Sequence, residues 1–238
     1  MSTRKRVAVL ISGRGSNMEA LLGAASEPSF PAEIVAVISN REDAAGLGLA
    51  SRRGVEAIAV PHRGHADRQA HEAALSEALA AHAPDIICLA GYMRLLTPDF
   101  VAQWQGRMIN IHPSLLPAFP GLDTHQRALD AGVRIHGCTV HFVTEKTDEG
   151  PIIAQAAVPV LAGDDANSLA TRVLLAEHKL YPLGLELVAT GKARMSEGRT
   201  AFSDPADASA EQRLFSPERQ EPVTAVPTDL EHLARFTP

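Results

Sequence analysis

Short apolar runs alternate with helix-like segments through the first half of the chain, and this alternation constrains the fold more than any other feature. The runs stay apolar at consecutive positions, as in strands covered on both faces, and they lie at 7–11, 34–38, 57–60, 86–90 and 108–111. Helical patterns lie between them, near 16–25, 44–53, 67–82 and 98–103. The sequence therefore predicts an α/β fold with a doubly wound, mostly parallel sheet that is Rossmann-like in its N-terminal half.

The second part of the chain has a different pattern. Two strand candidates, 136–143 and 152–160, flank a loop, and a long helix is expected over about 165–190. Apolar residues three and four positions apart, among them Leu169, Val173 and Leu180, give that helix one buried face. The pattern fades beyond about 195. We expect one domain over 1–195, in halves of about 1–100 and 101–195. A loose C-terminal extension over 196–238 follows, with one short helix near 229–236.

Charge and cysteine content narrow the class of protein. A net charge of -6 argues against nucleic acid as a partner. Every apolar stretch is shorter than the roughly 18 residues of a membrane span, and the short run after the basic N-terminus is predicted to be a strand, not a signal peptide. Cys88 and Cys138 lie in apolar, strand-like surroundings. They are typical of buried thiols in a cytoplasmic protein.

The eight residues Asn110–Pro117, with sequence NIHPSLLP, hold the most informative polar pair. Asn110 and His112 are two positions apart at the end of a strand candidate, so both side chains should point to the same side. An amide donor beside a group that titrates near neutrality suits a reaction that develops negative charge on oxygen while a proton moves. The alternative is a buried strand end with a hydrogen-bonded histidine.

A glycine-rich loop, Ser12–Asn17, follows the first apolar run and precedes a helix. The free N–H groups at a helix start attract phosphate, so Gly15, Ser16 and Asn17 are candidate phosphate-binding residues. The loop lacks the Gly-Lys-Ser/Thr ending of a P-loop, and Met18 replaces the last glycine of a dinucleotide fingerprint. Ser16 and Glu19 also fit a capping box, which is the structural alternative.

Two carboxylates are further candidates. Asp148 lies in an acidic loop that could be an ordinary surface turn, and its function depends on whether it reaches His112. A carboxylate there would orient the imidazole. Glu177 lies at the edge of the apolar face of the long helix, where it needs a partner, either a base within the protein or a ligand hydroxyl.

Other polar residues give weaker signals, and no metal site is expected. His62 and His65 form a short His-x-x-His in a polar loop without further spaced ligands. His136 and His141 are five apart in a strand candidate, so they should face opposite sides. Arg68 is expected to be a solvated charge unless a family resemblance gives it a role.

Together these segments resemble the folate-dependent phosphoribosylglycinamide formyltransferases. The resemblance covers about residues 6–192, and the matching segments run in family order: 15–17, 89–94, 110–117, 120–121, 136–143, 148–151, 177–178 and 181–182. It implies formyl transfer from 10-formyltetrahydrofolate, used as co-substrate, to the amine of 5′-phosphoribosylglycinamide. It also implies small-molecule substrates without metal, nucleic acid or membrane, and a monomeric or homodimeric cytoplasmic enzyme of purine biosynthesis.

The resemblance also assigns roles to individual residues. Those matching the catalytic group are Asn110, His112 and Asp148. The residues that match the ribonucleotide site are Gly15, Ser16 and Asn17 in the N-terminal half and Glu177 on the long helix. Those matching the folate site are Met93, Arg94, Leu96 and Asn110, with Arg68 at the folate glutamate tail. Glu149 stands where a small residue is expected, which adds a charge beside Asp148.

Three rival functions stay open. A hydrolase of formyltetrahydrofolate would use the same asparagine, histidine and aspartate with water in place of the amine. The chain starts at its first strand, which we expect to disfavour the N-terminal regulatory domain of such hydrolases. A formyltransferase acting on charged tRNA would need an added basic C-terminal domain, whereas this tail is acidic on balance. A non-catalytic nucleotide-binding module would not require Asn110, His112 and Asp148 together.

Overall fold

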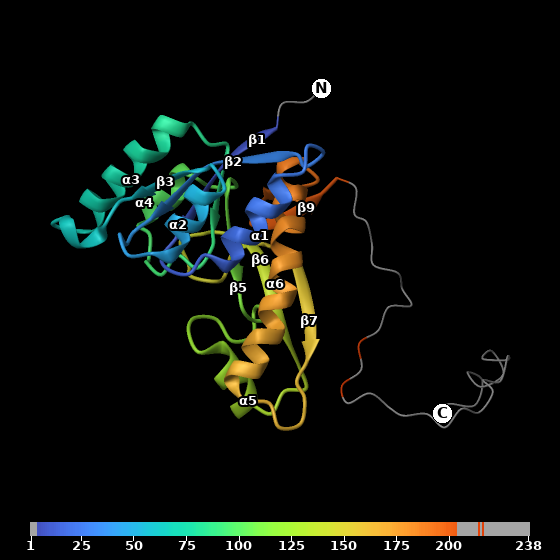
Figure 1. Ribbon diagram of the computed structural model, residues 1–238. Coiled ribbons are helices and arrows are strands. Elements are labelled where there is room, and N and C mark those ends of the chain that lie inside the picture. Colours follow the sequence, from blue (N-terminus) through green and yellow to red (C-terminus); the bar gives the residue numbers. More distant parts are fainter. Residues whose placement is uncertain (1–3, 204–213, 215, 217–238) are drawn as a thin grey trace, which may run out of the picture.

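A seven-stranded sheet forms the centre of the computed structural model, which describes residues 4–203, 214 and 216 (Figure 1). The strand order is β3-β2-β1-β4-β5-β6-β7. Neighbours among the first five are parallel, and β6 and β7 are added antiparallel. The prediction of a doubly wound, mostly parallel sheet is confirmed. The strands are β1 (Lys5–Ile11), β2 (Ala32–Ser39), β3 (Glu56–Ala59), β4 (Ile86–Leu89), β5 (Met108–His112), β6 (Ile135–Phe142) and β7 (Ile152–Pro159).

Helices cover both faces of the sheet (Figure 1). One buried cluster joins the sheet to α1, α2 and α6, and a second joins it to α3 and α4. Strand β1 shows why, because Val7 and Val9 belong to the first cluster and Ala8 and Leu10 to the second. The helices are α1 (Ser16–Ala25), α2 (Ala45–Arg52), α3 (Arg68–His82), α4 (Pro98–Gln103), α5 (Thr124–Asp130) and α6 (Ala166–Ala189), with a 3₁₀ turn η1 (His62–Gly64).

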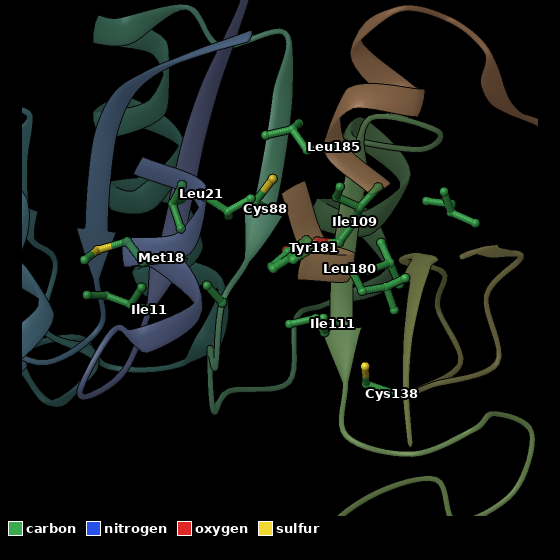
Figure 2. Close-up of a cluster of buried hydrophobic side chains, with 14 of the residues drawn as sticks. Ile11, Met18, Leu21, Cys88, Ile109, Ile111, Cys138, Leu180, Tyr181 and Leu185 are labelled. Atoms are coloured by element: carbon green, nitrogen blue, oxygen red, sulfur yellow. The ribbon is translucent and has the colours of Figure 1, made fainter. Parts of the chain in front are cut away.

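Helix α6 is anchored to the middle of the sheet through a buried tyrosine. Figure 2 shows Tyr181 among apolar side chains that include Cys88 and Ile109. Its hydroxyl oxygen lies 2.9 Å from the Leu89 carbonyl oxygen and 3.2 Å from that of Ile109. This anchor joins α6 to β4 and β5 and so fixes the position of Glu177, one turn earlier on the same helix.

Three features differ from the sequence-based predictions or lie outside them. Helix α5 was not predicted. A loose extension was expected from residue 196 onward. The structure instead has an antiparallel hairpin there, formed by β8 (Ala193–Ser196) and β9 (Arg199–Phe202). Its two-residue turn has φ of 49° at Glu197 and 75° at Gly198, the left-handed geometry of a tight hairpin. The helix expected at 229–236 lies outside the described residues.

Candidate active site

Most of the candidate residues lie at or just beyond the carboxyl ends of the parallel strands, where open α/β sheets bind ligands. The glycine loop follows β1, residues 91–96 follow β4, and Asn110 and His112 lie in β5. Strands β1 and β4 are neighbours, although their connections lead to opposite sides of the sheet. In open α/β sheets such a change of direction marks the crevice in which ligands bind.

His112 and Asp148 form a buried polar pair, and the half-buried Asn110 lies two residues before His112 on β5. The His112 Nδ1 atom lies 3.4 Å from Asp148 Oδ2, and their side chains are 7% and 9% exposed. The His112 Nε2 atom lies 3.0 Å from the Phe119 carbonyl oxygen. A carbonyl can only accept, so Nε2 carries a proton, and Nδ1 is the ring atom that faces the carboxylate. The loop with Asp148 is therefore not an ordinary surface turn.

His141 belongs to the same group, a role that was not predicted from the sequence. It lies opposite Asn110 in the antiparallel β5–β6 pair, and the Asn110 amide nitrogen lies 3.2 Å from His141 Nε2. His141 Nδ1 donates to the Phe142 carbonyl at 2.9 Å, so Nε2 is left to accept from the amide. Burial lowers the pKa of His141, in keeping with this neutral form. Only strand pairing reveals the contact, because Asn110 and His141 are distant in sequence.

Backbone geometry holds Asp148 in place. Its φ is 57°, and its carboxylate accepts a hydrogen bond from the Gly121 N–H at 2.8 Å. The chain then passes so close to β6 that a Cβ on Gly150 would lie 1.7 Å from the Phe142 carbonyl oxygen. Only glycine fits there. The charge on neighbouring Glu149 is directed elsewhere, since its carboxylate pairs at the surface with Lys146 at 3.3 Å.

The glycine loop presents the start of α1 without a side-chain cap. Gly15 is the N-cap residue with φ of 80°, and Ser16 is already the first helical residue. The predicted capping box is therefore wrong, and Glu19 pairs instead with Arg53 at 3.4 Å. No side chain caps this helix start, so its first N–H groups can serve an anionic ligand.

Asn17 and Glu177 meet across 160 positions of sequence. The Asn17 amide nitrogen donates to Glu177 Oε2 at 2.6 Å. Glu177 is 6% exposed, and burial raises the pKa of its carboxyl group while the hydrogen bond from Asn17 opposes that rise. The Asn17 Oδ1 atom is buried and has no hydrogen-bond partner in the described part of the chain. This pair satisfies only part of its hydrogen-bonding capacity, as expected of groups that bind a polar ligand.

The loop after β4 is tied to the glycine loop. The Met93 N–H donates to the Ser12 hydroxyl at 2.8 Å, and Ser12 donates to the Asn40 side-chain oxygen at 2.5 Å. The Met93 side chain is 71% exposed and therefore open to a ligand. Arg94 is half-buried, and its Nε atom has no hydrogen-bond partner. Leu96 packs against the second buried cluster.

Arg68 does not join the other candidates. It is exposed at the first residue of α3, and no hydrogen bond or ion pair links its side chain to another candidate within residues 4–203. A contact between Arg68 and a ligand would need a ligand that extends beyond the crevice.

The remaining histidines lie in separate surroundings. The ring of His136 packs against those of His125 and Phe119, at centroid distances of 5.4 and 5.9 Å. His62 was expected in a polar loop. Its Nδ1 atom lies 2.9 Å from the Asn40 carbonyl oxygen, so a hydrogen bond to the backbone holds its ring. Among the described residues, no three His, Cys, Asp or Glu side chains are arranged to hold a metal ion. No helix in the described part of the chain is long and apolar enough to cross a membrane.

The fold and the buried group are those of an enzyme that acts on small polar ligands, and comparison with known proteins defines its family. The sequence profile of the family described as "Formyl transferase" matches residues 5–185. The chain therefore belongs to the formyl transferase family.

Individual relatives agree with this assignment. The phosphoribosylglycinamide formyltransferase of Escherichia coli (strain K12) is 44% identical over 191 residues, which cover 80% of this chain and 90% of the relative. The trifunctional purine biosynthetic protein adenosine-3 of Bos taurus is 51% identical over 194 residues. That match covers 82% of this chain but only 19% of the bovine protein, so the chain spans about a fifth of that relative.

A solved structure is similar as well. The crystal structure of phosphoribosylglycinamide formyltransferase from Brucella melitensis is 60% identical and has a TM-score of 0.77. The alignment covers 79% of this chain and 97% of that one.

Proposed function

We propose that this chain transfers the formyl group of 10-formyltetrahydrofolate to the amine of 5′-phosphoribosylglycinamide, a step of purine biosynthesis. The observation that carries the proposal is the buried contact of His112 with Asp148 beside Asn110. Relatives that match most of their own length and carry this activity in their names support it. In this proposal, residues of about 1–100 form the phosphate- and nucleotide-binding half, and those of about 101–195 form the folate-binding and catalytic half.

The reaction forms one C–N bond and breaks another. The substrate amine attacks the formyl carbon, and a tetrahedral intermediate with a negatively charged oxygen forms. Collapse of that intermediate breaks the bond to N10 of the folate. The proton lost by the amine is delivered to N10. This sequence needs neither a covalent intermediate on the protein nor a metal.

Asn110 supplies a hydrogen-bond donor to the oxyanion, and the His112 ring supplies electrostatic support when it is positively charged. One hydrogen of the Asn110 amide is directed at His141, which leaves the second to donate to the oxyanion. His112 Nε2 is held by the Phe119 carbonyl, so proton transfer uses Nδ1. Asp148 faces that atom and stabilises the ring when it is positively charged.

The two substrates are assigned to different residues around this group. Gly15, Ser16 and Asn17 take the phosphate end of the ribonucleotide, and Glu177 takes its ribose hydroxyls. This fits the uncapped start of α1 and the partly satisfied Asn17–Glu177 pair. The folate lies along the loop after β4, against Met93, Arg94 and Leu96, with Arg68 toward its glutamate tail. Of the loop residues, Met93 is exposed and Arg94 has an Nε atom without a hydrogen-bond partner among the described residues.

A cytoplasmic location and a monomeric or homodimeric state complete the proposal. The free, buried thiols of Cys88 and Cys138 fit a reducing compartment. Size-exclusion chromatography with light scattering measures the oligomeric state directly.

The test is an absorbance assay of folate deformylation, run with and without the ribonucleotide. Strict dependence on the ribonucleotide, with the formylated product identified by mass spectrometry, is expected. Loss of the formyl group without the amine would instead identify a hydrolase. Binding of both ligands without product would indicate a binding module, and product only with another amine would indicate a different acceptor.

A further inference from the structure

The loop between β5 and α5 holds both halves of the His112–Asp148 pair through its backbone. The Phe119 carbonyl accepts from His112 Nε2 at 3.0 Å, and two residues later the Gly121 N–H donates to Asp148 Oδ2 at 2.8 Å. A shift of this loop would therefore move the ring and the carboxylate together. The segment Phe119–Asp123 is called the clamp loop below.

The clamp loop does not adopt an intrinsically favoured conformation. The φ angle is 55° at Phe119, 79° at Gly121 and 55° at Asp123. The two non-glycine residues are in the left-handed region, which such residues rarely occupy and which persists only where surrounding contacts impose it. Contacts outside the loop must therefore keep it in this shape.

Arg127, on α5, supplies those contacts. Its Nη1 atom donates to the carbonyls of Pro120 and Leu122, on either side of Gly121. Its guanidinium carbon also lies 5.7 Å from the centre of the Phe119 ring. One side chain thus fixes three of the five residues of the clamp loop, including the residue that holds His112.

We propose that Arg127 is a positioning residue that acts through the clamp loop to hold His112 and Asp148 at their mutual distance. It touches neither side chain, so its effect is on the geometry of the pair, not on the chemistry itself. The proposal rests on the proposed function for its kinetic consequences. Its structural consequence, a loop fixed by one guanidinium, can be measured in the free protein.

Arg107 offers a matched control. Its guanidinium carbon lies 4.6 Å from the centre of the Trp104 ring, and its Nη2 donates to the Gln103 carbonyl at 2.9 Å. It therefore makes the same two kinds of contact as Arg127. It precedes β5 at the end opposite His112, so its loss should perturb stability without reaching the site.

The first experiment measures amide hydrogen exchange and the His112 ring resonances by NMR in the wild type, R127A and R107A, without substrates. Exchange of the Gly121 amide should be at least about tenfold faster in R127A, and the His112 resonances should move, while R107A leaves both as in the wild type. Gly121 protection equal in R127A and R107A would overturn the proposal. This readout stands even if the wild type proves inactive on the ribonucleotide, which would overturn only the proposed function.

The second experiment measures kinetics as a function of pH. Because a displacement of about 1 Å at a catalytic pair can cost up to about 100-fold in rate, we expect R127A to lower kcat at least about tenfold, with both KM values within about twofold of the wild type. The pH dependence of kcat should change too, and R127K, which can still reach one carbonyl, should recover part of the rate. A fall in kcat no larger than that in R107A at equal Tm would show that Arg127 only stabilises α5.

Discussion

Two buried carboxylates lie at the candidate site, and they are held in opposite ways. Asp148 accepts from the Gly121 N–H and faces His112 and His141, at 3.4 and 3.8 Å. Within residues 4–203, Glu177 accepts from one donor, Asn17, whose own oxygen has no partner in that range. The first carboxylate is fixed before any ligand binds, as a group that orients a base must be. The second retains capacity for ligand hydroxyls, as a recognition group must.

The comparison therefore separates chemistry from binding. Changes at Asp148 should act on turnover, and changes at Glu177 should act on affinity for the ribonucleotide. The tests below are ordered from the largest expected effect to the smallest.

The largest effect should follow from Asp148→Asn. Removing the negative charge that faces His112 should lower kcat by about 100- to 10,000-fold, because proton transfer and oxyanion support both depend on the ring. His112→Ala should have a similar effect. Steady-state kinetics measure the fall in kcat, and circular dichroism checks that each variant is folded. Glu149→Gln is the matched control at the next position and should be close to wild type. Near-normal turnover in folded His112→Ala would contradict the assigned roles.

Glu177→Gln should act mainly on the ribonucleotide. Loss of a charged acceptor for hydroxyls costs about 1.5–3 kcal/mol, so its KM should rise by about 10- to 100-fold while the folate KM changes little. Asn17→Ala should raise the same KM. The control is Glu186→Gln, which changes an exposed carboxylate on the same helix. Equal changes in both KM values would break the distinction between the two carboxylates.

His141→Leu should have a smaller effect, on kcat alone. The variant removes the acceptor that aims the Asn110 amide, and we expect kcat to fall by about tenfold, less than for loss of an oxyanion donor. Progress curves at saturating concentrations of both substrates measure it. A change confined to either KM would place His141 in substrate binding and outside the Asp148 group.

The smallest effect concerns the buried histidine behind the clamp loop. Burial, with lesser contributions from nearby His125 and His112, lowers the pKa of His136 from 6.5 to about 4. The unfolded chain takes up a proton near pH 6.5 and the folded chain only near pH 4, so the free energy of unfolding should fall as pH drops through this window. The slope should approach 1.4 kcal/mol per pH unit for this group. Urea unfolding between pH 7 and 4.5 measures it, and an equally steep curve in His136→Gln would contradict the assignment.

Several parts of the fold followed from local pattern. The strands and helices predicted in the first half all form, with ends that move by one or two residues: β5, expected over 108–111, reaches His112. Asn110 and His112 do share a side of β5. The hairpin at 193–202 was missed, although its Glu-Gly turn between short extended segments was a usable signal. The Ser16–Glu19 capping box was wrong because the helix starts at Ser16, one residue earlier than that motif requires.

The sequence by itself determined the alternation of strands and helices, the side on which Asn110 and His112 project and the tight turn at Gly15, because each depends on backbone geometry over a few neighbouring residues. Only the tertiary structure decided that Asp148 reaches His112, that His141 aims the Asn110 amide, and that Asn17 meets Glu177 160 positions away. These contacts depend on strand order and on the register between strands. A shift of one residue would turn the side chains of a strand to the other face of the sheet, and local sequence patterns do not encode that choice.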